Sequence, residues 1–257
     1  MVKNTLTYVI VGLMLVFLVG CQVQMGGTEE SETNADAGSD QMQSGNGRAV
    51  FVITDAAADM GSVTSVKITI DSIKVHSESE GWVDVSSNSE TYDLLQLKAE
   101  GKNELLADIE LKEGNYDEIK LDISKVVVTD AQGEHEAKLP SGELKIKSEL
   151  NVESNLTSSA SFDFVADESL HVTGNGRYIM APVIVVETRE NADVEIKSGS
   201  SVEVKSGRVR TNVKIGMDLD GNIGIGVKVP SNLNLSVGTD GSIGIGANSK
   251  GNIGVEV

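Results

Sequence analysis

The side chains best suited to metal chemistry in this sequence are three histidines, one cysteine and many carboxylates. The histidines are His76, His135 and His171, and none stands in a His-x-His or His-Glu-x-x-His spacing. A zinc site needs three or four converging ligands, and Cys21 is the only cysteine in the sequence. The glutamates on either side of His135 would point away from the imidazole in an extended chain, so we expect a solvated loop there.

Acidic residues close together in sequence are the second candidate for a metal site. Asp55 and Asp59 bracket an alanine segment, and with nearby carbonyl oxygens they could bind Ca²⁺, which takes about 6–8 oxygen ligands. The alternative, which we favour, is that Asp55 caps a turn by hydrogen bonding to its own backbone. Asp218-Leu219-Asp220-Gly221-Asn222 is similar to the start of a calcium loop but lacks the later bidentate glutamate, so a hairpin turn is the better interpretation.

The sequence carries no motif for nucleophilic or phosphoryl-transfer catalysis. It contains neither a Gly-x-Ser-x-Gly turn nor a phosphate-binding loop. We therefore expect no catalytic residues, no cofactor and no enzymatic activity. The alternative is a secreted carbohydrate-active hydrolase, because 34 acidic residues lie between positions 22 and 197. Such an enzyme would hold a carboxylate pair roughly 5–10 Å apart in a cleft.

Composition excludes several other classes of protein. The 257 residues contain 21 Lys and Arg against 39 Asp and Glu, a net charge of −18. A chain so acidic cannot neutralise a phosphate backbone, so we expect no nucleic-acid partner. A single cysteine excludes a disulfide framework. The length allows one large domain or two small ones of about 100–200 residues each.

The N-terminal segment has the features of a secretory signal. Lys3 precedes the apolar run Tyr8–Val19, which is shorter than the ~20 residues of a membrane span. Leu18-Val19-Gly20-Cys21 resembles the lipobox of bacterial-type lipoproteins, which implies cleavage before Cys21 and diacylglyceryl transfer to its sulfur. We expect 1–20 to be a signal peptide and acyl chains such as palmitate at Cys21 to anchor an extracytoplasmic protein in a membrane of the cell envelope. The alternative is an uncleaved anchor with an incidental cysteine.

Residues 21–47 are predicted to be a disordered acidic tether. Positions 22–47 contain five acidic residues, no basic residue and no aromatic residue. Such a stretch buries too little apolar area to offset its loss of chain entropy. A flexible chain of this length spans roughly 25–30 Å, which would lift the folded part off the lipid surface.

Residues 48–197 alternate apolar and polar side chains with a period of two, which indicates strands. Val66, Ile68 and Ile70 alternate with polar residues, and the pattern slips by one at Asp71-Ser72, which predicts a β-bulge. Helical turns are expected only around 93–97 or 104–106. Many short strands separated by glycine turns indicate an all-β fold, an antiparallel β-sandwich of transthyretin-like or immunoglobulin-like type.

Residues 198–257 are predicted to form a glycine-rich hairpin tail, packed on the main domain or stacked as a ribbon. They contain 12 of the 27 glycines, and Asp220–Gly226 reads DGNIGIG, which returns as DGSIGIG at Asp240–Gly246. A third copy begins at Lys250. Asp-Gly favours a type I′ turn with two positive φ angles. Strands with bare glycine faces could also add to the sheet edge of a neighbouring molecule.

The main domain resembles the DUF4382 family, a family of secreted domains of unknown function. The resemblance covers residues 48–188 in order and is carried by Ile53–Asp59, Val63–Ile70, Val75-His76, Gly81-Trp82, Tyr92–Leu97, Leu111–Leu121, His135–Gly142, Val172–Gly176 and Pro182–Ile184. Two small departures are Ala57, where the family often has proline, and Asn115. The resemblance implies an envelope lipoprotein and brings no known activity. The glycine-rich tail is not part of it.

Aromatic residues are sparse, at 4% of the chain. Trp82 is the only tryptophan, and we expect it in the core of the sandwich; exposed beside Tyr92, it would instead be able to stack on a sugar. We therefore predict a non-enzymatic binding or structural protein. Its expected partners are membrane lipid at Cys21 and an envelope protein or polysaccharide.

Overall fold

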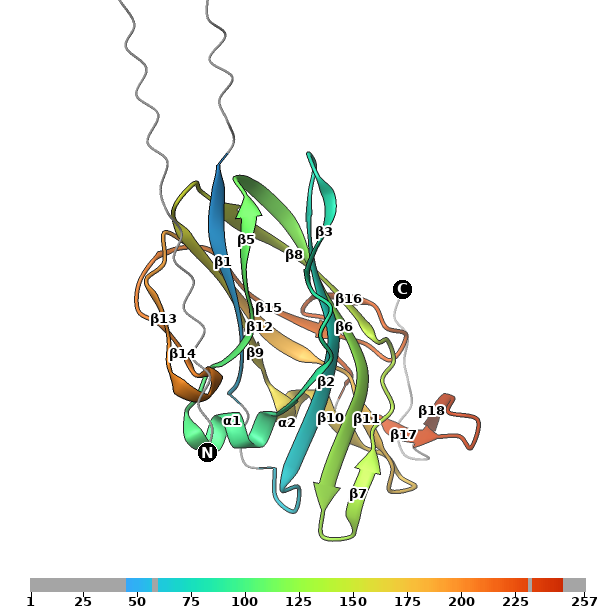
Figure 1. Cartoon of the computed structure of the whole chain (residues 1–257). Coiled ribbons are helices and arrows are strands. Elements are labelled where there is room, and N and C mark those ends of the chain that lie inside the picture. Colours follow the sequence, from blue (N-terminus) through green and yellow to red (C-terminus); the bar gives the residue numbers. More distant parts are fainter. Residues whose placement is uncertain (1–44, 57–59, 231–232, 247–257) are drawn as a thin grey trace, which may run out of the picture. The chain divides into compact units, whose positions relative to one another are not determined.

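The computed structural model describes residues 45–56, 60–230 and 233–246, and strands dominate them (Figure 1). Six strands form the first sheet. In spatial order they are β16 (Ile223–Ile225), β15 (Arg208–Met217), β12 (Val183–Glu190), β9 (Thr157–Phe164), β1 (Asn46–Asp55) and β5 (Glu104–Lys112). The predicted all-β antiparallel architecture is confirmed with one departure: β1 and β9 run parallel, because β9 enters from a crossover between sheets and not from a hairpin.

The second sheet is built on two long central strands. Its members are β3 (Gly81–Ser86), β2 (Ser65–Ser77), β6 (Gly114–Asp130) and β7 (Gly133–Glu136), with β4 (Glu90–Asp93) on β2 and β8 (Glu143–Val152) on β6. On the edge that does not face β6, β2 pairs with β4 and then with β3. On the edge that does not face β2, β6 pairs with β8 and then with β7. The predicted bulge is present: the pairing of β2 with β6 skips Asp71 and Ser124. The Ser124 hydroxyl donates to Asp71 Oδ1 over 2.9 Å.

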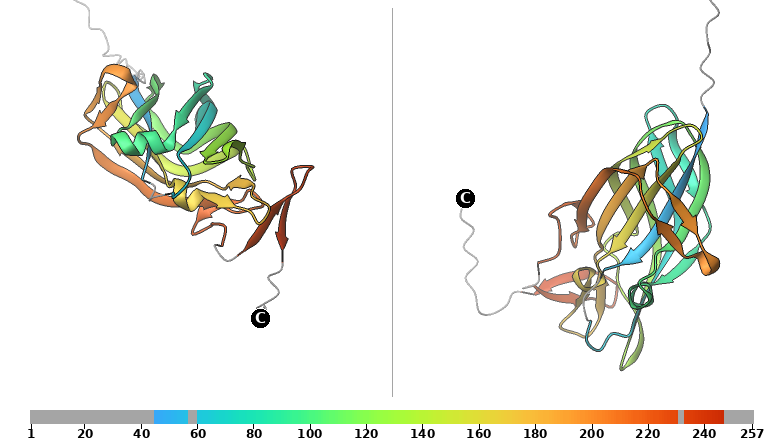
Figure 2. Two further views of the ribbon diagram at one scale, coloured as in Figure 1. Left: turned by 90° about the horizontal axis from the view of Figure 1, so that it is seen from below. Right: turned by 90° about the vertical axis from the view of Figure 1, so that its left-hand side faces the viewer.

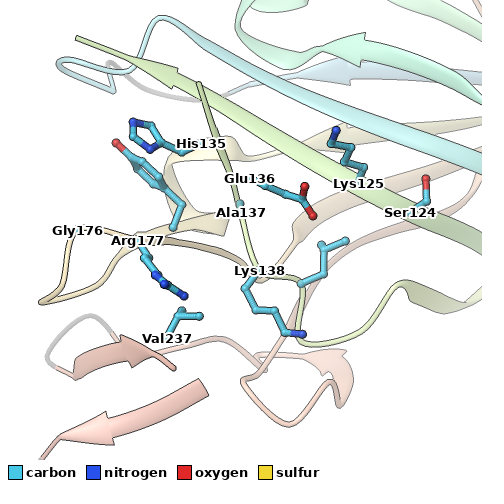
Figure 3. A pocket seen from close by; sticks show the side chains of 11 residues that line it. Ser124, Lys125, His135, Glu136, Ala137, Lys138, Gly176, Arg177 and Val237 are labelled. Carbon is cyan, nitrogen blue, oxygen red and sulfur yellow. The ribbon is translucent and has the colours of Figure 1, made fainter. Parts of the chain in front are cut away.

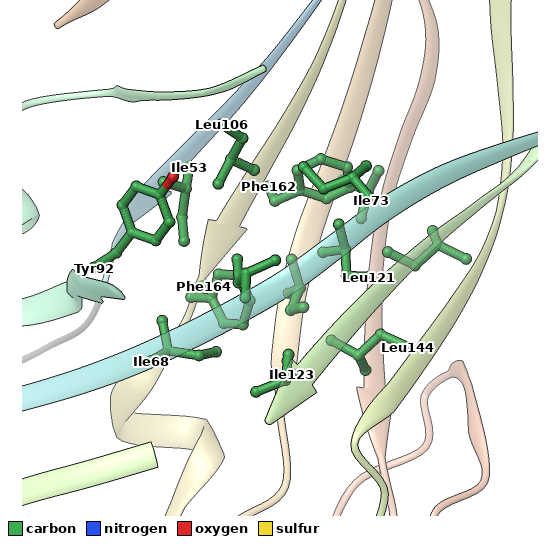
Figure 4. Close-up of a cluster of buried hydrophobic side chains, with 14 of the residues drawn as sticks. Ile53, Ile68, Ile73, Tyr92, Leu106, Leu121, Ile123, Leu144, Phe162 and Phe164 are labelled. Carbon is green, nitrogen blue, oxygen red and sulfur yellow. The ribbon is translucent and has the colours of Figure 1, made fainter. Parts of the chain in front are cut away.

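The core lies between the two sheets (Figure 4). Phe162 and Phe164 of the first sheet and Ile68 and Leu121 of the second are completely buried there. Each alternates along its strand with a polar residue on the outer face, as a sandwich requires. The period-two pattern of the sequence thus corresponds to one buried and one solvated face per sheet. Figure 2 shows the two sheets from further directions.

The expectation that Trp82 belongs to the core is wrong. Its side chain is 44% exposed, whereas Tyr92 is 5% exposed and cannot accompany it on the surface. The reason is strand alternation: Val83 and Val85 of β3 take the inward positions, which leaves Trp82 and Asp84 on the outer face. The other six Phe and Tyr side chains in the described residues are at most 5% exposed and supply the aromatic part of the core.

Two short helices close the ends of the strands. The first predicted helical turn is confirmed as α1 (Leu94–Glu100), where Asp93 accepts from the Gln96 amide and Gly101, at φ 58°, ends the helix. The second is wrong, because 104–106 pairs with β1 as part of β5. The helix α2 (Ala166–Ser169) follows β9. No helix in the described ranges has the length and apolar character to cross a bilayer.

Three small hairpins surround the sandwich. One pairs β10 (Leu170–Val172) with β11 (Tyr178–Met180), and another pairs β13 (Val194–Ile196) with β14 (Val202–Val204), which follows the short 3₁₀ turn Ser198–Ser200. Val202 packs on Val50 and Val52 and covers that part of the outer face of β1. The third pairs β17 (Asn234–Val237) with β18 (Ile243–Gly246).

The glycine repeat forms two hairpins, but their turns differ from the predicted type I′. Gly221 and Gly241 both have φ 82°, whereas neither Asp220 nor Asp240 has a positive φ. In each turn the glycine amide donates to the carbonyl three residues earlier, Asp218 or Gly238. One left-handed residue after an ordinary turn is the pattern of a three-residue hairpin loop with a bulge. The first hairpin joins β15 to β16 within the first sheet, so the glycine-rich segment contributes to the sandwich itself.

Candidate functional site

Of the two acidic residues Asp55 and Asp59 that the sequence offers as calcium ligands, only Asp55 is among the described residues. Asp55 is buried at the end of β1, and its Oδ1 accepts from the Ala166 amide over 3.1 Å, which caps α2. Residues 57–59, which contain the turn that Asp55 is expected to cap, lie outside the described residues, so that expectation stays a prediction. Asp59 and Cys21 lie outside the described residues. Within those residues no group of three or more His, Cys, Asp or Glu side chains is placed to hold a metal ion.

The three histidines have separate surroundings. His76 lies on the outer face of β2, with Nδ1 2.8 Å from Asp117 Oδ1. His135 Nε2 lies 3.0 Å from Asp130 Oδ1 on the neighbouring strand. His171 is in β10, where burial lowers its pKa. His135 also borders a cavity.

That cavity, which we call the basic pocket, has a volume of about 470 Å³ (Figure 3). Its wall includes Lys125 from β6, His135 and Glu136 from β7, Lys138 just after β7, Arg177 just before β11, Tyr178 at the start of β11, and Val237 at the end of β17. Four parts of the sequence, spread over more than a hundred residues, therefore meet in one place. Neither spacing nor periodicity brings them together, which is why sequence reasoning missed this site.

The pocket collects cations that have no carboxylate partner. Thirteen of the 19 Lys and Arg side chains in the described residues form ion pairs, and six do not. Three of those six, Lys125, Lys138 and Arg177, line this pocket and are exposed. Glu136 is the only carboxylate in the lining. In a chain with a net charge of −18, this is a local concentration of positive charge.

A hydrogen-bonded network holds one wall of the basic pocket. The Tyr178 hydroxyl donates to Asp130 Oδ2 over 2.6 Å, and Asp130 Oδ1 is 3.0 Å from His135 Nε2. The bond to the Asp130 carboxylate, together with burial, raises the pKa of Tyr178 to about 12. The same bond is the main cause of a lowered pKa at Asp130. The phenol and the carboxylate thus stay in complementary protonation states, which fixes the Tyr178 and His135 rings, 5.6 Å apart.

Backbone contacts position the cationic side chains. Lys138 exchanges hydrogen bonds with β11: its amide donates to the Tyr178 carbonyl, and its carbonyl accepts from the Met180 amide, both over 2.8 Å. Arg177 Nη1 donates to the Gly238 carbonyl over 2.8 Å. That bond uses one of five guanidinium N–H donors. The remaining donors match the geometry of carboxylate and phosphate oxygens, so the arrangement is suited to binding an anion.

A second, smaller pocket gathers carboxylates beside α1. It has a volume of about 300 Å³ and includes Asp93, Glu100 and Glu104. Each carboxylate already has a partner. Asp93 accepts from Ser65 over 2.6 Å, Glu100 accepts from Gln96 over 2.8 Å, and Glu104 pairs with Lys102 at 3.7 Å. The three side chains therefore stabilise the ends of α1 and β5.

Comparison with known proteins gives one match. A family model described as a domain of unknown function, DUF4382, matches residues 46–182. Neither the curated proteins nor the solved structures contain a match. The matched range includes most of the basic pocket but ends before Val237, so the wall supplied by β17 lies outside it.

Proposed function

The chain belongs to the DUF4382 family, and from its own residues we propose that it is a lipid-anchored protein of the cell envelope that binds an anionic ligand in the basic pocket. The acyl chains at Cys21 would tether it, and its role would be binding without catalysis. Lys125, Lys138 and Arg177 would hold the anionic groups of the ligand. An acidic envelope polysaccharide is the ligand class that fits the proposed location.

One observation carries this proposal: cations without ion pairs gather in one pocket of an acidic chain. Elsewhere the basic side chains are used in pairs such as Arg48 with Asp108, 2.8 Å apart. Unpaired like charges repel one another, so a stable fold gains nothing from placing three of them around one cavity. An anionic ligand would supply the missing counter-charge. Bidentate bonds from Arg177 would add direction to that attraction.

The ligand test is a calorimetric titration of the protein with oligogalacturonate, a soluble acidic oligosaccharide. The protein used is the soluble part, residues 22–257, which lacks the predicted signal peptide and Cys21. The double variant Lys138→Ala/Arg177→Ala should bind at least tenfold more weakly, since hydrogen bonds to charged groups contribute about 1.5–3 kcal/mol each. Raising the salt concentration should weaken binding to the unmodified protein.

The matched control is Lys98→Ala/Lys228→Ala. It removes the same charge from two other basic residues that lack ion pairs in the described part of the chain, and neither lines the pocket. It should bind like the unmodified protein. Equal affinities for the pocket variant and this control would contradict the proposal.

The anchor has a separate test. Cys21→Ser should move the protein from the membrane fraction to the soluble fraction, because each buried CH₂ of the acyl chains contributes about 0.8 kcal/mol of membrane affinity. Mass spectrometry of the unmodified protein should find an acylated N-terminal cysteine. A mature protein that keeps Met1 would contradict this part of the proposal.

A further inference from the structure

Trp82 is placed on the surface in a way that is typical of a binding residue. It is 44% exposed, while every Phe and Tyr side chain in the described residues is at most 5% exposed. It lies on β3, an edge strand of the second sheet. Exposing an indole forfeits part of the free energy that its full burial would supply.

The indole and the end of the Lys120 side chain meet on the outer face of the sheet. Trp82 on β3 and Lys120 on β6 are separated by β2, a span of about 10 Å for two strand spacings. Lys120 Nζ nevertheless lies 5.8 Å from the centroid of the indole ring. The His76 ring is 5.2 Å from it, tilted by 56°. These contacts support the ring from the sheet side and make it a fixed platform.

The charges around this platform are paired with one another. Lys74 lies 2.8 Å from Asp84, and Lys120 lies 2.9 Å from Glu143. Lys145 also pairs with Glu143, at 2.9 Å. A charged ligand would have to compete with these pairs. A hydroxyl group can donate to a carboxylate and accept from a lysine without separating them.

We propose that the outer face around Trp82 binds an uncharged polysaccharide, with a pyranose ring stacked on the indole. The C–H groups of a sugar ring pack on an aromatic face, and the ion pairs beside the ring supply partners for its hydroxyl groups. The face is an open sheet and not a pocket, so it fits a chain of sugars better than a single one. This site is independent of the basic pocket and of the proposed anionic ligand.

The same observations disfavour a protein partner or a membrane surface. The centre of a protein interface is depleted of charged residues, whereas Lys74, Asp84, Lys120 and Glu143 surround the indole. Stable binding to a lipid surface uses an extended apolar face, and Trp82 is the only large exposed apolar residue among the described residues of the second sheet. A single aromatic ring within a polar surface matches a ligand that alternates apolar faces with hydroxyl groups.

The test uses the only tryptophan of the chain as its own reporter. Cellohexaose and chitohexaose, two uncharged linear oligosaccharides, are titrated against the soluble protein while Trp82 fluorescence is recorded. At least one should produce a saturable change. Calorimetry with that probe should show a loss of at least tenfold in affinity for Trp82→Ala and a smaller loss for Trp82→Phe, which keeps an aromatic face.

The matched control is Ile225→Ala, which removes another exposed apolar side chain, 78% exposed, from the first sheet. It should bind the oligosaccharide normally. Thermal unfolding should confirm that Trp82→Ala remains folded. No response to either probe, or a response to oligogalacturonate alone, would overturn the inference. The pocket variant Lys138→Ala/Arg177→Ala should leave the Trp82 signal unchanged, so the two proposals can fail separately.

Discussion

The two described copies of the glycine repeat have nearly the same sequence and different structural roles. In the first, β15 and β16 belong to the six-stranded sheet, and Met217 is completely buried in the core. In the second, β17 and β18 form a sheet of only two strands. Hydrogen bonds attach that hairpin to the turn between β10 and β11, where the Gly174 amide donates to the Leu235 carbonyl over 2.8 Å. The first copy thus supplies the edge strand of the first sheet, whereas the hairpin that contains the second copy supplies Val237 to the wall of the basic pocket.

This difference shows that the repeat specifies a hairpin but not where the hairpin packs. Gly216 illustrates the additional requirement of the first copy: a Cβ there would lie 2.1 Å from the Val227 carbonyl oxygen. The chain can pass this close only because residue 216 has no side chain. In both copies the outer isoleucine stays exposed, Ile225 at 78% and Ile245 at 61%. Whether a hairpin of the repeat joins the main sheet therefore depends on the strand that precedes the repeat, β15 or β17.

Truncation should separate the two copies most strongly. A chain that ends at residue 206 lacks β15 and leaves β12 paired on one side only, with β9, so we expect no cooperative unfolding transition. A chain that ends at residue 230 keeps both six-stranded sheets and should fold. Circular dichroism with thermal unfolding checks both. A cooperative transition in the shorter chain would show that the first copy is dispensable.

Core substitutions should give the next largest difference. Met217→Ala should lower the free energy of unfolding by about 2–5 kcal/mol, as for other large-to-small changes in a core. Leu235→Ala should mainly release the β17–β18 hairpin, because its cost is limited by the free energy of local docking. Urea denaturation measures the first effect, and hydrogen exchange of the β17 amides measures the second. Equal shifts of the global midpoint would contradict the distinction.

The Asp218 carboxylate in the turn of the first copy should make a smaller contribution to stability. Asp218 Oδ1 accepts from the Asp220 and Asn222 amides, both over 2.9 Å, and the bond from the Asn222 side chain is the main cause of its lowered pKa. Asp218→Asn should cost about 1 kcal/mol at neutral pH. A lowered folded-state pKa stabilises the fold above the ordinary value of 3.8, and this contribution is lost as pH falls through the folded-state pKa.

The measurement is urea denaturation of Asp218→Asn at pH 7 and at about pH 3, with Asp220→Asn as the matched control for charge. The difference between Asp218→Asn and the unmodified protein should shrink at the lower pH. Asp220→Asn should change stability little at either pH, because none of the hydrogen bonds of this turn in the described chain ends on the Asp220 carboxylate. A pH-independent effect of Asp218→Asn would show that its charge is not involved.

Removal of the second copy should have the smallest of these effects, a modest loss of affinity for the ligand of the basic pocket. The chain that ends at residue 230 keeps Lys125, Lys138 and Arg177 but loses Val237 and the carbonyl of Gly238 that accepts from Arg177. We expect it to bind oligogalacturonate only several-fold more weakly than the full soluble part, since the cations remain. Calorimetry measures the change. A complete loss of binding would assign the main part of the site to the second copy.

Most of the strands could be predicted from the sequence because their pattern is local. Alternation along Val66–Ile70 and the slip at Asp71 identify β2 and its bulge without reference to any partner. Trp82 shows the limit of such reasoning. A tryptophan side chain favours a core position. In β3, however, Val83 and Val85 take the inward-facing positions, and Trp82 lies on the outer face. Where residue type and strand register disagree, register decides.

Composition and neighbouring residues were enough to predict the acidic character of the chain, its all-β class and its glycine-rich hairpins, although not the type of their turns. The basic pocket and the exposed surface around Trp82 could be recognised only in the folded protein. Lys125, Lys138 and Arg177 come from separate strands and loops that meet only after the sheets have packed. Charges that are unremarkable along the chain thus become a site through the way the strands are ordered in space.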